Sequence, residues 1–275
     1  MMTGISAATG TGTDDGQQIR FSRQGAVATI RFNRPAALNA IDAALAERLL
    51  VICRELAGCE DVRVVVLSGE GKSFMAGGDL SSFHEDKVGA SATAERIIAP
   101  LHEALLILAG LPQLVIGSVH GTVAGAGVSM ALACDLCLAA DDTRFNLAYA
   151  RIGTSPDAGA TWMLPRIVGV RKALELALLA ENIPAAEAAR LGIINKVVPA
   201  TELAAETAAL ARRLAEGPAF AYAQIKQLMR ASLERTLPDQ LDAERLAFRA
   251  CAASADFGEG LDAFFEKRMP AFKGR

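Results

Sequence analysis

Two glycine-rich segments could bind an anionic oxygen through their backbone. One reads Phe74-Met-Ala-Gly-Gly-Asp-Leu80 and the other His120-Gly-Thr-Val-Ala-Gly-Ala-Gly127, and each stands between an apolar, strand-like run and a helix. Glycine lets main-chain N–H groups approach a ligand closely, and a helix start adds its positive dipole end. Two such N–H groups converging on one point would form an oxyanion hole. Glycine content alone equally suits tight turns that serve packing.

A carboxylate in a third segment, Gly153-Thr-Ser-Pro-Asp157-Ala-Gly159, could move a proton. From the residues alone, an Asp after a proline is also typical of an N-cap, here for a helix beginning near Ala158. Metal chemistry is not expected. The pair His102-Glu103 lacks the second histidine of a zinc motif, because position 106 is leucine.

The composition limits the class of protein. The 275 residues carry 28 basic and 31 acidic side chains, a net charge of −3, which offers no basic field for nucleic acid or an anionic membrane. Hydrophobic residues make up 52% and aromatic residues only 5%, which is typical of an alanine-rich globular enzyme. Residues 104–134 lack Asp, Glu, Lys and Arg, but Pro112 and several glycines interrupt them, so we expect no membrane span.

The cysteines and the N-terminus indicate a reducing compartment. Five scattered cysteines do not suit a disulfide framework. Cys134 and Cys137 form a C-x-x-C pair in an apolar segment without a second pair at zinc-ligand spacing, so we expect buried structural thiols. Residues 1–17 have neither the basic start nor the apolar core of a signal peptide and are expected to form a disordered tail. We therefore expect a cytoplasmic protein.

Alternating strands and helices must position the glycine segments. Strands are expected at 26–32, 62–67, 114–119 and 135–139, helices at about 41–56, 97–108 and 126–133, and loops at 69–79 and 121–127. This order predicts an α/β fold with repeated crossover units. The expected organisation is the tail at 1–17, a core at 18–200, and a helical region at 201–275 that covers the site or forms an oligomer interface.

Six short motifs stand in one order along the chain. They are Asn33-Arg-Pro, Leu38-Asn-Ala, Ser73-Phe-Met-Ala-Gly-Gly-Asp-Leu80, His120-Gly-x3-Gly-Ala-Gly127 with Ala133-Cys-Asp135, Gly153-Thr-Ser-Pro-Asp-Ala-Gly159, and Glu259-Gly-x3-Phe264-Phe-Glu-Lys-Arg268. In this order and at this spacing they resemble the crotonase superfamily (enoyl-CoA hydratase/isomerase), over about residues 19–275.

The resemblance implies a fold, a substrate and an assembly. The fold is a spiral of repeated β-β-α units, whose C-terminal helices build homotrimers that often pair into hexamers. The substrate is an acyl-CoA thioester, so coenzyme A belongs to the substrate and no separate cofactor is needed. The N–H groups of Gly78 and Ala126 would bind the thioester oxygen. The Ala76 carbonyl would contact the adenine, and Phe264 and Lys267 would reach the CoA of a neighbouring subunit.

The same resemblance bears on the reaction. The two glutamates of the family's hydratases fall on Ser129 and Tyr149, and neither hydroxyl is a general base at neutral pH without an activator. The segment around Asp157 is similar to that of superfamily isomerases, including dienoyl-CoA and ring-epoxide isomerases. We therefore expect an isomerase that shifts a double bond, or rearranges an enolisable ring, with Asp157 as its acid–base group.

Three alternatives stay open at this point. The first is a hydratase that uses Asp157 and an ordered water. Another is substitution through an Asp157 ester on an electron-poor aryl substrate, since the position also resembles the nucleophile of 4-chlorobenzoyl-CoA dehalogenase. The third is a non-catalytic acyl-CoA-binding scaffold. Tyr149 is expected to line the acyl pocket or donate a hydrogen bond, Asp79 to brace the first glycine segment, and His84 and His102 to be surface or packing residues.

Overall fold

The computed structural model describes residues 17–274, so the expected tail lies outside the described residues except for Gln17. The strands are β1 (Ile19–Gln24), β2 (Val27–Phe32), β3 (Val64–Gly69), β4 (Ser73–Met75), β5 (Leu114–Val119), β6 (Thr122–Ala124), β7 (Leu136–Ala140), β8 (Arg144–Asn146), β9 (Ile183–Pro184) and β10 (Lys196–Val198).

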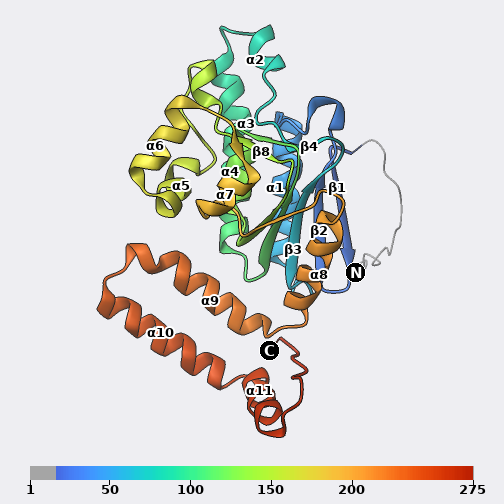
Figure 1. Ribbon diagram of the computed structural model, residues 1–275, viewed down its shortest axis with the longest axis vertical. Coiled ribbons are helices and arrows are strands. Elements are labelled where there is room, and N and C mark those ends of the chain that lie inside the picture. Colours follow the sequence, from blue (N-terminus) through green and yellow to red (C-terminus); the bar gives the residue numbers. More distant parts are fainter. Residues whose placement is uncertain (1–16, 275) are drawn as a thin grey trace, which may run out of the picture.

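Helices follow most of the strand pairs (Figure 1). They are α1 (Ala43–Ala57), α2 (Ser81–Glu85), α3 (Ala90–Gly110), α4 (Ala126–Ala133), α5 (Ala160–Val168), α6 (Val170–Leu179), α7 (Ala185–Arg190), α8 (Leu203–Ala215), α9 (Ala219–Ala231), α10 (Leu237–Ala252) and α11 (Ala255–Glu266), with short 3-10 helices η1 (Pro35–Ala37), η2 (Tyr149–Ile152) and η3 (Ser232–Glu234). Within residues 17–274 no helix is both long and apolar enough to cross a membrane.

The strands form two sheets. The larger sheet has the order β1-β2-β3-β5-β7-β10 and is parallel except for the β1–β2 pair. The smaller sheet has the order β4-β6-β8-β9, in which β4, β6 and β8 are parallel and β9 is antiparallel. Strands β3, β5 and β7 are each followed by a short strand of the second sheet and then by a helix. The repeated β-β-α spiral expected from the sequence is confirmed.

Helices cover the larger sheet on both faces, which explains its continuous apolar strands. In β3, Val65 and Leu67 join the main core with α1 and α3, whereas Val64 and Val66 pack against α8 on the opposite face. Successive strand residues point to opposite faces, so a strand buried on both sides must be apolar at every position. Helix α8, although within the helical region at 201–275, therefore packs as part of the sheet's cover.

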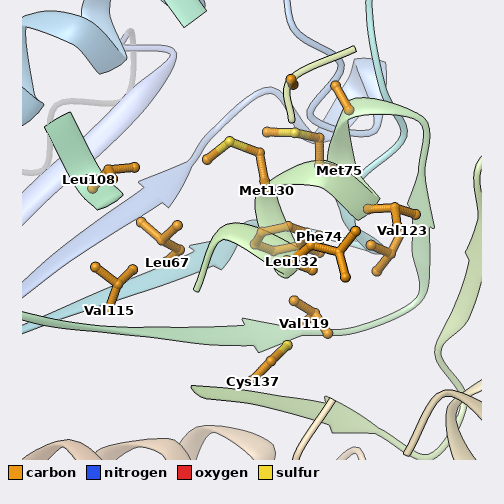
Figure 2. Packing of buried hydrophobic residues seen from close by; sticks show 14 of the residues in the cluster. Leu67, Phe74, Met75, Leu108, Val115, Val119, Val123, Met130, Leu132 and Cys137 are labelled. Atoms are coloured by element: carbon orange, nitrogen blue, oxygen red, sulfur yellow. The ribbon is translucent and has the colours of Figure 1, made fainter. Parts of the chain in front are cut away.

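The two segments expected as loops contain short strands. β4 and β6 each have three residues and pair with each other in parallel. Phe74 and Met75 of β4, Val123 of β6 and Met130 of α4 all belong to the main buried cluster (Figure 2). The glycine segments are therefore turns next to short strands whose side chains pack in the main buried cluster.

The last three helices extend away from the sheets as an arm (Figure 1). Its base is fixed by Lys226 of α9, whose Nζ lies 2.9 Å from an Asp135 carboxylate oxygen and is almost fully buried. Arg230, one helical turn later, donates to the other oxygen of Asp135 at 2.7 Å. Beyond this base the arm carries many exposed apolar side chains, among them Leu237, Phe248, Phe264, Phe265 and Met269.

Candidate active site

The two glycine turns meet in space. Gly77 and Gly125 both have positive φ, +105° and +50°, and a Cβ on Gly125 would lie 3.4 Å from the Cα of Gly77. At the start of α4 the approach is closer still, because a Cβ on Gly127 would lie 2.2 Å from the Met75 carbonyl oxygen. A side chain at Gly127 would therefore require the backbone to move, and one at Gly77 or Gly125 would be strained by the positive φ. These glycines therefore bring the end of β4 against the start of α4.

The next residue in each turn offers a free donor. Among the described residues, neither the Gly78 N–H nor the Ala126 N–H donates a hydrogen bond to a protein group. Ala126 is the first residue of α4, where the helix leaves its N–H groups unpaired and places its positive dipole end. Both residues line the same cavity. The structure thus brings together the two N–H groups that the sequence predicts as oxyanion donors.

This cavity has a volume of about 640 Å³ and lies between α2, α3, η2 and the two turns. Its wall is largely apolar and includes a few polar side chains. The lining residues are Ile41, Gly78, Leu80, Phe83, His84, Ala90, Ala94, Ile97, Ile98, Leu101, Ala126, Tyr149, Ile152, Thr154, Ser155 and Asp157. Asp157 is the single carboxylate among the described lining residues. His84, expected at the surface or in packing, is exposed but belongs to this wall.

Asp157 does not cap a helix, so that interpretation is wrong. Helix α5 begins at Ala160 with Gly159 as its N-cap and without a side-chain cap. The reason is local backbone geometry, since Ala158 and Gly159 both take left-handed φ values, +50° and +79°. The Asp157 side chain instead accepts a hydrogen bond from the Tyr149 hydroxyl at 2.5 Å.

Tyr149 and Ser129 hold Asp157 at two atoms, the carboxylate and the main-chain carbonyl. The buried Ser129 hydroxyl donates to the Asp157 main-chain carbonyl at 3.0 Å and lies 3.4 Å from the Tyr149 hydroxyl. Burial, and secondarily the negative charge of Asp157, raise the pKa of Tyr149 above its ordinary value. The phenol therefore keeps its proton at neutral pH and acts as a donor. The two positions at which the resemblance places the glutamates of hydratases both contact Asp157 here.

Tyr149→Phe is expected to lower kcat about tenfold while KM changes little. The substitution keeps the ring in the cavity wall but leaves Oδ1 of Asp157 without its donor, and a hydrogen bond to a charged group contributes about 1.5–3 kcal/mol. The expected loss in kcat is smaller than this free energy would give, because a carboxylate without a donor is a stronger base. Steady-state kinetics on an accepted enoyl-CoA substrate measure it. A wild-type kcat would show that the hydrogen bond has no role in orienting the carboxylate.

An ion-pair network braces the first turn. Arg34 lies 2.9 Å from a carboxylate oxygen of Asp79 and 3.1 Å from one of Asp42, the N-cap of α1. Ser81 donates to the other Asp79 oxygen at 2.6 Å. Hydrogen bonds from Ser81, with Arg34 beside it, keep the pKa of Asp79 below its ordinary value. The carboxylate next to Gly78 therefore stays ionised and fixed, as a bracing role requires.

Other predicted residues lie away from the cavity. Ala76 lies two residues before Gly78, and its N–H donates to the Leu38 carbonyl. It is not among the residues that line the cavity. Phe264, in α11, and Lys267 are exposed at the far end of the arm from α2 and α3 (Figure 1). The structure of one chain therefore does not bring them to the site.

One contact near the site was not foreseen. His102 of α3 is exposed, yet its Nε2 accepts a hydrogen bond from the Ala158 N–H at 3.1 Å. No short-range sequence pattern signals this contact, because the two residues are 56 positions apart.

The paired thiols Cys134 and Cys137 keep their protons. Cys134 and Cys137 are free, and burial raises the pKa of the Cys137 thiol to about 12 and that of Cys134 well above its ordinary value. A thiol that holds its proton is a poor nucleophile and a poor ligand. In the part of the chain that the structure describes, no group of three or more His, Cys, Asp or Glu side chains is placed to hold a metal ion.

Several known proteins are similar to this chain in sequence and in fold. A Rhodobacter capsulatus protein named probable enoyl-CoA hydratase is 40% identical, over 94% of this chain and 98% of its own length. The 1,2-epoxyphenylacetyl-CoA isomerase of Escherichia coli is 38% identical, over 90% of this chain and 95% of its own. The crystal structure of an enoyl-CoA hydratase from Polaromonas sp. JS666 superposes with a TM-score of 0.88 at 32% identity, covering 93% of this chain and 99% of that one.

The family model described as enoyl-CoA hydratase/isomerase matches residues 22–275, nearly the whole chain. Its match agrees with the β-β-α spiral and with the paired glycine turns at the cavity. The chain belongs to the enoyl-CoA hydratase/isomerase family, the crotonase superfamily.

Proposed function

We propose that the protein is an acyl-CoA isomerase that moves a double bond, or rearranges an enolisable ring, through an enolate. The observation that carries the proposal is the lining of one cavity. Two unpartnered main-chain donors, at Gly78 and Ala126, share it with one carboxylate, Asp157, the sole acidic side chain among the described lining residues. One carboxylate suffices to carry a proton from one carbon to another, whereas adding water usually takes two groups.

The proposed steps balance without any further group. The Asp157 carboxylate removes a proton from the carbon next to the double bond, and the electron pair moves into the thioester to form an enolate. The N–H groups of Gly78 and Ala126 stabilise the negative oxygen. Protonated Asp157 then returns the proton to the other end of the conjugated system. Tyr149 occupies Oδ1, and within the described residues Oδ2 accepts no hydrogen bond, which leaves it free for the transfer.

The support for isomerisation over hydration comes from the same residues. The Ser129 hydroxyl donates to the Asp157 carbonyl, so neither glutamate position supplies a base for water. Relatives are named for both reactions. Besides the isomerase of E. coli, a Streptococcus mutans trans-2-decenoyl-[acyl-carrier-protein] isomerase is 32% identical, over 95% of this chain. The runner-up is a hydratase in which Asp157 and an ordered water replace the glutamates.

The proposal extends to the substrate and the assembly. The apolar wall supports an aliphatic or aromatic acyl group, and coenzyme A enters as part of the substrate, without a separate cofactor. We further propose a homotrimer, or a hexamer of two trimers, in which Phe264 and Lys267 of one subunit reach the CoA of its neighbour. The projecting arm with its exposed apolar residues supports this assembly, and a lysine ammonium suits a phosphate.

A parallel assay of two substrates tests the proposed reaction. We expect the purified protein to convert a 3-enoyl-CoA into its 2-enoyl isomer, so that the ultraviolet band of the conjugated enoyl thioester grows. Crotonyl-CoA should keep that band in the same buffer. Loss of the crotonyl-CoA band, with hydroxyacyl-CoA carrying solvent oxygen, would establish the hydratase instead. Binding of acyl-CoA without turnover of aliphatic, aromatic or ring substrates would leave only a scaffold.

A further inference from the structure

We infer that His102 is a positioning residue, which holds the acid–base segment in place by accepting the N–H of Ala158. The inference rests on the isomerase proposed above and assigns a role to a side chain outside the cavity. His102 does not belong to the cavity wall, but its neighbour Leu101 does. Its hydrogen bond therefore ties the acyl side of the cavity, formed by α3, to the residue directly after Asp157.

The backbone at Ala158 needs such a partner. Ala158 is fully buried and has a left-handed φ of +50°, which an L-residue adopts at a cost in free energy. Its main-chain N–H is buried with it, and a buried N–H without a hydrogen-bond acceptor is strongly disfavoured. The His102 Nε2 at 3.1 Å is the acceptor it has. Without it, the peptide between residues 157 and 158 is held only at its carbonyl oxygen, and a tilt of this peptide would move the Asp157 side chain.

Three helical elements then hold Asp157 and the peptide that follows it. Ser129 of α4 holds its main-chain carbonyl oxygen, and Tyr149 of η2 holds its carboxylate. His102 of α3 holds the following amide. A misplacement of about 1 Å in a catalytic group can cost on the order of 10²-fold in rate, so loss of one of these supports has a measurable effect even though His102 touches no substrate.

The contact also dictates the chemical form of the ring. Because the Ala158 N–H donates to Nε2, that nitrogen must carry a lone pair, and the neutral ring holds its hydrogen on Nδ1. A glutamine at this position can present its side-chain oxygen where Nε2 stands. A leucine fills similar space but offers no acceptor.

The first test compares these two substitutions in the intact protein. We expect His102→Leu to lower kcat, and the exchange of substrate α-protons with deuterated water, by roughly 10- to 100-fold with KM unchanged. His102→Gln should restore most of the loss. Glu95→Leu, on an exposed position of the same helix, is the control and should behave as wild type. Equal losses in the leucine and glutamine variants, or no loss in either, would overturn the acceptor role.

A second measurement does not depend on turnover. The chain has three histidines, at 84, 102 and 120, so histidine-labelled protein gives few ring-nitrogen signals, which single substitutions assign. We expect His102 as the Nδ1–H tautomer in wild type and faster hydrogen exchange at the Ala158 amide in His102→Leu. An Nε2–H tautomer would refute the contact. If instead wild type exchanges no substrate protons while the tautomer is as expected, the isomerase proposal fails and the His102 contact stands.

Discussion

Asp157→Asn is expected to lower the rate of isomerisation about 10²- to 10⁴-fold, the usual contribution of a positioned acid–base group. Asparagine keeps an oxygen that can accept from Tyr149, so the local structure should persist. It cannot take up a proton at neutral pH. Substrate α-proton exchange should therefore fall together with kcat, whereas the affinity for a saturated acyl-CoA, measured by calorimetry, should remain.

The matched control for this substitution is Asp61→Asn, which removes the charge of an exposed carboxylate outside the cavity wall. It should leave both rates unchanged. Wild-type exchange in Asp157→Asn would remove Asp157 from the mechanism. A covalent acyl or aryl ester on Asp157, detected by mass spectrometry of the wild type, would instead identify it as a nucleophile.

Loss of the Ala126 N–H is expected to lower kcat about 10²- to 10³-fold, equivalent to about 2.7–4 kcal/mol of transition-state stabilisation. The donor is a main-chain group, so the clean change replaces the amide of residue 126 by an ester, through incorporation of lactic acid at that position. Ala126 donates no protein hydrogen bond through its N–H in the described structure, but the ester makes the Gly125 carbonyl a weaker acceptor for the Val128 and Ser129 N–H groups, so we expect a modest loss of stability. The unfolding midpoint of the purified variant checks this.

The control for the ester is protein made from the same altered codon but decoded with alanine, which should match wild type. Since the enolate oxygen carries more charge than the ground-state carbonyl, the loss should appear mainly in kcat. A loss confined to KM would mean that the N–H binds substrate and transition state equally. An unchanged kcat would place the negative oxygen elsewhere.

Sequence reasoning succeeded where a local pattern determines the structure. Helix 126–133 was predicted with the bounds that α4 has, because a glycine turn precedes it and an apolar, helix-forming run fills it. The strand around residues 62–67 was predicted because burial on both faces demands an unbroken apolar run. The two glycine turns were located for a related reason, since each follows a buried apolar strand, β3 or β5.

Features set by tertiary contacts could not be predicted. Strands β4 and β6 are three residues long, too short for a periodic pattern, and form because each lies beside the other. The edge strand β1 was missed because its residues are mostly exposed, which leaves no apolar alternation. Helix α5 was expected two residues early because nothing in the sequence announces the left-handed Ala158.

The candidate site shows the same limit. The residues at 129, 149 and 157 were identified separately, but the hydrogen bonds that join Ser129 and Tyr149 to Asp157 depend on how α4, η2 and the following segment pack. The His102 contact depends on α3 lying beside residue 158. The sequence therefore predicted which residues could take part in the chemistry, but it did not predict the hydrogen bonds between them.

The free donors at positions 78 and 126 belong to the backbone, so most substitutions there keep them, whereas substitutions of the side chains around position 157 change the chemistry of the site. Any residue but proline supplies the same N–H, and at Gly78 an added Cβ would meet no atom within 4 Å. Drift in side chains at these positions therefore leaves the donors in place. The groups around the carboxylate, at 129, 149 and 157, are side chains that a single codon change can replace. A lineage with this architecture can thus exchange the side chains around position 157 while the strand–turn–helix frame that presents the two free N–H groups is inherited unchanged.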